Sequence, residues 1–189
     1  MARKVTITKE MILESALKML IRDGYSSINI KTLASEIGCS TQPISWHFKN
    51  MEGLRKALAG YAREYAARKA ASYSDNAAED FAHMGEAYIS MAVNEPNLFR
   101  FLYLGELPVS RAYSAEDISG DKESELISRI SAQTGLSQKQ AALCIRDTVI
   151  YSHGIAVMLL TGVFKATENE AMNMIKSASE CFVEKRKGE

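Results

Sequence analysis

The chain has 189 residues, equal numbers of acidic and basic residues and three cysteines, so it is long enough for one domain or for a small head on a larger body. The cysteines form no closely spaced pair, which argues against a disulfide framework or zinc knuckle and favours a reducing cytoplasm. No secretory signal opens the chain, and residues 149–164, an apolar run interrupted by His153 and two glycines, are too short for a membrane span and are interpreted as a buried helix.

Helix signals begin at the N-terminus, where Thr8 can cap a first helix and Gly24 stands where that helix should end. Residues 29–54 then have the pattern of two short helices joined by a tight turn. Leu33 and Ala34 belong to one apolar face, and Gly38 supplies the backbone freedom that the turn needs. This pattern is typical of a helix-turn-helix and indicates DNA binding.

The second of these short helices has distinct inner and outer faces. Ile44 and Phe48 are four residues apart and share the inner face, while Gln42, Pro43 and Trp46 lie about 160° to 260° away at roughly 100° per residue. For Trp46, packing against the first helix remains an equal alternative to DNA contact, and His47 could cap its helix instead of contacting phosphate. The predicted DNA-binding residues are Lys31, Thr32, Thr41, Gln42, Pro43, Ser45, Trp46, His47, Lys49 and Asn50.

Charge is unevenly distributed along the chain. Residues 1–70 contain twelve basic and six acidic residues, and the remainder contains eleven basic and seventeen acidic residues. Two ordinary solvated surfaces would also have such charges. A basic head on an acidic body fits the helix-turn-helix better.

Further helices are predicted at 51–72, 76–94, 97–104, 123–134 and 137–164 and from 167 to the charged tail, with a loop at 105–122. The predicted fold is therefore all-α, with a three-helix head and a C-terminal bundle of about six helices. We expect a helix-turn-helix head at 1–50, a connecting fourth helix at 51–72, and a ligand-binding and dimerisation domain at 73–189.

The head resembles the tetracycline-repressor family of bacterial transcriptional regulators. The resemblance rests on spaced residues over about 50 positions, namely Ala16, Leu17, Gly24, Tyr25, Leu33, Ala34, Gly38, Trp46, His47, Phe48, Glu52 and Leu54. The body is similar more loosely, through residues 96–104 and through Tyr151, His153 and Gly154, which look like the Trp-His-Gly motif of one class of C-terminal domains.

The resemblance implies a cytoplasmic homodimer, most simply a repressor, that releases a pseudo-palindromic double-stranded operator when a small-molecule inducer binds. It implies no cofactor and no membrane partner. Two residues depart from the family pattern, because Ser45 replaces a common tyrosine and Met51 a common lysine. In the family both contact phosphate, so we expect an ordinary or weak salt dependence of DNA binding. The alternative is a small-molecule-binding helical protein whose head binds operators weakly or not at all.

Two further sets of residues follow from the resemblance, although both could simply be core. An adaptable apolar pocket is expected from Met84, Tyr88, Met91, Phe99, Leu102, Tyr103, Tyr113, Tyr151, His153 and Met158. The dimer interface is expected from Gly154, Met158, Gly162, Met174, Ala178 and Phe182 on the last two helices. Catalytic and metal sites are not expected, because only His83 and His153 lie outside the head and no nucleophile or metal-ligand motif accompanies them.

Overall fold

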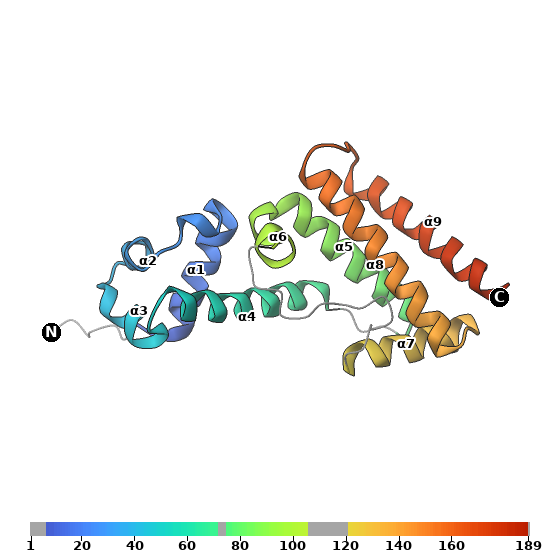
Figure 1. The fold of residues 1–189 in the computed structure, drawn as a ribbon, viewed down its shortest axis with the longest axis horizontal. Helices are drawn as coiled ribbons and strands as arrows, with labels where there is room; N and C mark the ends of the chain where they lie inside the picture. The colour runs from blue at the N-terminus through green and yellow to red at the C-terminus, as the bar shows by residue number, and fades with distance from the viewer. Residues whose placement is uncertain (1–6, 72–74, 106–120, 189) are drawn as a thin grey trace. The chain divides into compact units, whose positions relative to one another are not determined.

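The structure, a computed structural model, describes residues 7–71, 75–105 and 121–188 (Figure 1). Its regular structure is helical throughout these residues, which confirms the predicted all-α class. The elements are α1 (Lys9–Asp23), η1 (Tyr25–Ser27), α2 (Ile30–Ile37), α3 (Thr41–Phe48), α4 (Met51–Ala70), α5 (Ala77–Asn94), α6 (Pro96–Tyr103), α7 (Asp121–Thr134), α8 (Gln138–Leu160) and α9 (Glu168–Lys187).

Local capping residues explain where several helices begin. The side chain of Thr8 accepts a hydrogen bond from the backbone of Met11 at the start of α1. Capping boxes of Ser137 with Gln140 and of Thr167 with Glu170 begin α8 and α9. At its other end α8 stops at Leu160, four residues before the predicted end.

Contacts between residues divide the chain into two compact units that do not follow chain order. The first contains α1, η1, α2, α3, α4 as far as Arg68, and α6, and the second contains α5, α7, α8 and α9. The segment 95–105 therefore packs with the helix-turn-helix although α5 precedes it in the sequence. The functional domains expected at 1–50, 51–72 and 73–189 remain a prediction, because these units are defined by packing alone.

The first unit is built around apolar side chains that leave water completely. Ile12, Leu20, Leu33, Ile44, Leu54, Leu58, Leu98, Phe99 and Phe101 each have a relative exposure of 0% and come from α1, α2, α3, α4 and α6. Burial of this kind is the main favourable term in folding. Helix α3 contributes Ile44 to this buried set and packs against α1 and α2.

Helix α6 is joined to the rest of this unit by specific contacts. The side-chain amide of Asn97 donates hydrogen bonds to the carbonyl oxygens of Ile21 and Arg22, at 3.2 and 3.4 Å. The ring of Phe101 stacks on Tyr25 with centroids 5.0 Å apart, and the guanidinium of Arg55 in α4 lies 5.1 Å from the centre of the same tyrosine ring. Tyr25 thus connects α4 with α6.

In the second unit α8 and α9 run side by side (Figure 1). One ion pair joins them near the C-terminus, where Asp147 in α8 lies 2.7 Å from Arg186 of α9. Asp147 also lies 2.7 Å from its neighbour Arg146 in α8. The side-chain amide of Gln140 also donates to the backbone carbonyl of Arg186 at 2.9 Å. These polar bonds hold the last turn of α9 against α8.

Only one face of α8 is covered. Cys144, Ile145 and Thr148 are buried, and the hydroxyl of Thr148 donates to the carbonyl oxygen of Cys144 at 2.9 Å. Helix α8 is long and apolar enough to cross a membrane, and 33% of its apolar stretch is buried. Core helices of soluble proteins can have the same length and composition, so these two properties are weak evidence for a membrane span.

Candidate nucleic-acid interface

The turn between α2 and α3 follows from local chemistry. The side chain of Asn29 accepts bonds from the backbone N–H groups of Lys31 and Thr32, and the Thr32 hydroxyl accepts from the Asn29 N–H, so α2 begins with a reciprocal cap. Gly38 ends α2 in the left-handed region, with φ 73° and ψ 36°. The chain then turns at Cys39 into α3, as the helix-turn-helix prediction requires.

Helix α3 has a buried face and an exposed face, as its sequence predicts. Ile44 and Phe48 are 0% and 5% exposed, whereas Trp46 is 78% exposed. Trp46 therefore lies on the outward face, as the helical spacing predicts, and does not pack against α1. Its ring is the most exposed large hydrophobic side chain among the described residues, so it is available to a partner.

The ten predicted DNA-binding residues do not all lie free in solvent. Eight are exposed, namely Lys31, Thr32, Thr41, Gln42, Ser45, Trp46, Lys49 and Asn50, and two are half-buried, Pro43 and His47. Three of the ten also have structural bonds. Thr32 caps α2, Asn50 accepts from the N–H of Gly53 at 2.9 Å, and the Nε2–H of His47 donates to the carbonyl oxygen of Ile7 at 3.2 Å.

His47 and Phe48 together fix the start of α1. In addition to the bond from His47 to Ile7, the ammonium of Lys9 lies 5.9 Å from the centre of the Phe48 ring. The rings of Trp46 and His47 meet edge to face, with centroids 4.6 Å apart. The exposed indole is therefore held by an imidazole that is itself held by the backbone before α1. These contacts across 40 residues have no signal in the sequence.

An ion pair on the first unit also has no sequence signal. The guanidinium of Arg22 in α1 donates two hydrogen bonds, each of 3.1 Å, to the carboxylate of Glu36 in α2. Hydrogen bonding from Arg22 holds the pKa of Glu36 below its ordinary value, and that of Asp23 likewise. Both carboxylates therefore remain charged, and Arg22 is paired.

The residues expected to form a ligand pocket are divided between the two units. Phe99, Leu102 and Tyr103 lie on α6 in the first unit, where Phe99 is fully buried and Tyr103 is 41% exposed. In the second unit are Met84, Tyr88, Met91, Tyr151, His153 and Met158, and Tyr113 lies outside the described residues. Within the second unit one pair meets directly, because the Tyr88 hydroxyl is 2.6 Å from Nδ1 of His153.

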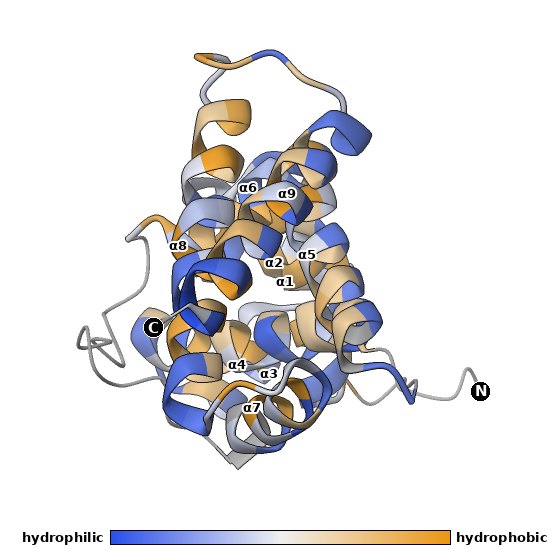
Figure 2. Ribbon diagram, turned by 90° about the vertical axis from the view of Figure 1, so that its right-hand side faces the viewer, coloured by the Kyte–Doolittle hydropathy of each residue, from blue (hydrophilic) through white to orange (hydrophobic). Residues whose placement is uncertain are grey.

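The residues expected at the dimer interface lie along one side of α8 and α9. Met158 and Met174 are 43% and 37% exposed, and Figure 2 shows hydrophobic segments along both helices. Gly154 is exposed, Ala178 is half-buried, and Gly162 lies in the turn after α8 with φ 72°. Phe182 packs partly into the core of its own unit, and its ring meets Tyr151 edge to face at 6.5 Å.

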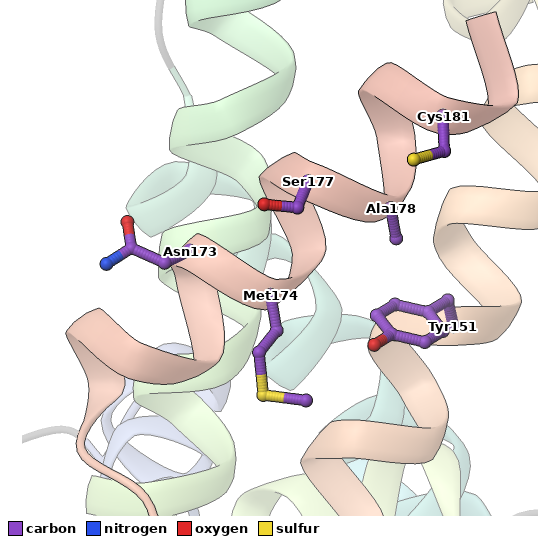
Figure 3. Close-up of a pocket in the computed structure, with 6 residues that line it drawn as sticks. All are labelled: Tyr151, Asn173, Met174, Ser177, Ala178 and Cys181. Atoms are coloured by element: carbon purple, nitrogen blue, oxygen red, sulfur yellow. The ribbon is translucent and has the colours of Figure 1, made fainter.

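A shallow hollow of about 430 Å³ opens on this side of the second unit, between α8 and α9. Its lining is Tyr151, Asn173, Met174, Ser177, Ala178 and Cys181, and in Figure 3 Ala178 points from α9 toward the ring of Tyr151 on α8. Tyr151, expected in the ligand set, therefore shares a surface with two residues of the dimer set.

Comparison with known proteins extends this local evidence. The model of the family described as bacterial regulatory proteins, tetR family, matches residues 12–58. An uncharacterized HTH-type transcriptional regulator of Mycobacterium tuberculosis, Rv0681, is 24% identical over 173 residues, which cover 90% of this chain and 78% of that protein. The head of the chain therefore matches the tetR family over residues 12–58. Together these similarities support a transcriptional regulator with a DNA-binding helix-turn-helix rather than an enzyme.

Solved structures share the fold of this chain at low sequence identity. TetR from Acinetobacter baumannii AYE has a TM-score of 0.71 at 16% identity, covering 96% of this chain and 99% of that chain. A variant of that TetR, solved in complex with minocycline, has a TM-score of 0.63 with the same identity and coverage. BioQ bound to its double-stranded DNA operator has a TM-score of 0.51 at 16% identity, with 92% and 98% covered.

Proposed function

We propose that this protein is a cytoplasmic repressor of the tetR family that binds a pseudo-palindromic operator as a homodimer and releases it when a small molecule binds. The observation that carries the DNA-binding part is the exposed face of α3, where Gln42, Ser45 and Trp46 stand out from a helix whose other face is buried. The complex of BioQ with its operator supports the same use of this fold.

The exposed face of α3 has the chemistry to contact a major groove. An amide such as Gln42 can pair with the adenine edge, a hydroxyl such as Ser45 can bond base or phosphate, and the Trp46 ring can contact a thymine methyl group or sugar. Lys31 and Lys49 add positive charge on either side of these residues. Phosphate contacts position the helix, and base contacts select the sequence.

The homodimer is proposed from the uncovered side of α8 and α9. Met158 and Met174 are partly exposed there, and Gly154 and Ala178 beside them are small enough for a close approach of helices. A two-fold axis would place this side against itself, forming an isologous interface. Two recognition helices can enter successive major grooves only if they are about 34 to 36 Å apart, or a multiple of that distance.

Release by a ligand is proposed as a population shift. A ligand that prefers a different spacing of the recognition helices would lower the fraction able to bind DNA, and DNA would lower its affinity in turn. In the second unit we propose Tyr88 and His153 as polar contacts of the ligand, beside Met84 and Met91 as adaptable apolar ones. The complex of the related TetR variant with minocycline supports a ligand role for this fold.

A footprint on DNA flanking the gene tests the proposed recognition face. Wild type should protect a two-fold symmetric site, and Gln42→Ala and Ser45→Ala should each weaken or alter protection, because each removes a polar contact. Ser128→Ala is the matched control, since Ser128 is an exposed serine of α7 that belongs neither to α3 nor to the proposed dimer surface. If wild type protects a site and neither α3 variant changes it, the assigned face is wrong.

The alternative, a small-molecule-binding protein with a weak or inactive head, rests on the two departures Ser45 and Met51. A mobility-shift assay with genomic fragments at low and moderate salt separates the two functions. A shift at low salt that weakens as salt rises supports the regulator. Absence of any shift at low salt, together with a ligand that raises the melting temperature, supports the alternative.

A further inference from the structure

The link between α3 and α4 contains an unusual backbone conformation at Lys49. Its φ of 65° and ψ of −53° make it the one residue other than glycine with positive φ among the described parts of the chain. The N–H of Asn50 donates to the carbonyl oxygen of Phe48 at 2.8 Å, so three residues close a γ-turn of the rare, strained type. Strain of this kind persists only where the surrounding structure enforces it.

Gly53, in the first turn of α4, leaves the room that this turn needs. A Cβ atom at this position would overlap the carbonyl oxygen of Phe48 and would lie 3.3 Å from the carbonyl carbon. Both are backbone atoms, which cannot rotate away as the end of a side chain can. The N–H of Gly53 also donates a hydrogen bond to the side chain of Asn50. The first and third residues of the γ-turn, Phe48 and Asn50, therefore both contact Gly53.

The side chain that this turn presents has no partner of its own in the described structure. The ammonium of Lys49 is exposed and takes part in no ion pair or hydrogen bond among the described residues. A glycine or asparagine would adopt positive φ at lower cost. A lysine held there against its conformational preference therefore fits an anionic partner outside the chain.

We propose that Gly53 is a positioning residue for DNA binding, which lets the carbonyl of Phe48 rest on α4 and so directs the Lys49 ammonium to a backbone phosphate. This inference rests on the proposed function, because it requires that the head binds DNA. It also accounts for one of the two departures in the head: Met51 lacks the ammonium expected at that position, and Lys49 lies two residues before it.

The test compares Gly53→Ala with Gly60→Ala, since a Cβ at Gly60 in the same helix would meet no atom within 4 Å. Binding to the flanking DNA fragment is measured over a range of salt. In Gly53→Ala the slope of log K against log salt should become less steep by about 0.9, the value of one lost phosphate contact. Lys49→Gln should show the same loss, and the double variant should lose no more than either alone.

Gly60→Ala should bind as wild type does. If wild type binds and Gly53→Ala keeps the wild-type slope, or if its effect adds fully to that of Lys49→Gln, the inference is wrong while the proposed function stands. If no protein shifts any fragment at low salt, both proposals are wrong.

A second pair of variants keeps the test informative even if Gly53→Ala does not fold. Lys49→Gly and Lys49→Gln both lack the ammonium, but only glycine relieves a positive φ. Lys49→Gly should therefore melt at the higher temperature, with both showing the reduced salt slope. Equal melting temperatures, or a wild-type slope in both variants, would overturn the inference.

Discussion

The side-chain amide of Asn97 donates a hydrogen bond to the carbonyl oxygen of Ile21, across 76 positions of sequence. This carbonyl belongs to the last turn of α1, where backbone oxygens have no partner within the helix. Asn97 follows the proline that begins α6, and it also reaches the carbonyl of Arg22. The helix-turn-helix is therefore stabilised by a helix that lies beyond α5 in the chain.

Removing this contact should destabilise the first unit. We expect Asn97→Ala to lower the free energy of unfolding by about 1 kcal/mol, since the part-buried carbonyl group of Ile21 loses a donor. Thermal unfolding of the intact chain, followed by circular dichroism, measures the change. Arg100→Ala is the control, because Arg100 is exposed on the same helix. Equal melting of Asn97→Ala and wild type would show that α6 is held by apolar packing alone.

The ion pair between Arg22 and Glu36 predicts a dependence of stability on pH. Because Arg22 lowers the pKa of Glu36 below its ordinary value of 4.5, the unfolded chain binds the proton more readily than the folded chain does. The stabilisation is therefore complete above about pH 5 and is lost as the pH falls through the lowered pKa. Its size should be small, since both side chains are exposed.

The measurement is the difference in melting temperature between wild type and Glu36→Gln, taken from neutral pH down to acidic pH. The difference should be present at neutral pH and should shrink below pH 4.5. Glu64→Gln, at an exposed position of α4, should show no comparable trend. A difference that grows toward acidic pH would contradict the assigned sign.

A charge on the uncovered side of α8 and α9 should prevent dimer formation. Met174→Glu would place an unpaired carboxylate in the proposed interface, where desolvation of a charge is costly. Sedimentation at concentrations on the order of micromolar should give a single species of 20.9 kDa for this variant and a larger one for wild type. Val163→Glu is the control, since Val163 is 75% exposed beyond the end of α8. A wild type that sediments only at 20.9 kDa would rule out the dimer.

The hydrogen bond between Tyr88 and His153 should give a measurable coupling energy in a double-mutant cycle of unfolding. Tyr88→Phe and His153→Leu each break the same hydrogen bond, so their effects on the free energy of unfolding should fail to add, by about 0.5 to 3 kcal/mol. Tyr88→Phe with Tyr103→Phe is the control pair, because Tyr103 belongs to the first unit. Additive effects for Tyr88 and His153 would show that the hydrogen bond contributes nothing to stability.

Features encoded by neighbouring residues could be predicted from the sequence. The capping boxes at Ser137 and Thr167 each need only four consecutive residues, and the exposed face of α3 follows from helical geometry around Ile44. The predicted end of α8 at residue 164 is wrong, also for a local reason. Val163 and Phe164 extend the apolar pattern, but Gly162 adopts a left-handed φ of 72° and the helix has already stopped.

Contacts between distant residues could not be predicted in this way. Nothing around Asn97 indicates that its amide reaches Ile21, and nothing around His47 indicates a bond to Ile7. The strained turn at Lys49 has no sequence signal either, because positive φ is usually marked by glycine or asparagine. The room for it, left by the absence of a Cβ at Gly53, lies four residues later in another helix.

The hollow between α8 and α9 bears on any search for compounds that act on this protein. In the proposed dimer the second copy covers Tyr151, Met174 and Ala178, so a compound that filled the hollow would compete with subunit association. Such a compound would release DNA as an inducer does, but its potency would fall as the protein concentration rises, whereas occupation of a site inside one subunit would show no such trend. Titrating the protein at fixed compound concentration therefore separates inhibitors of assembly from inducers.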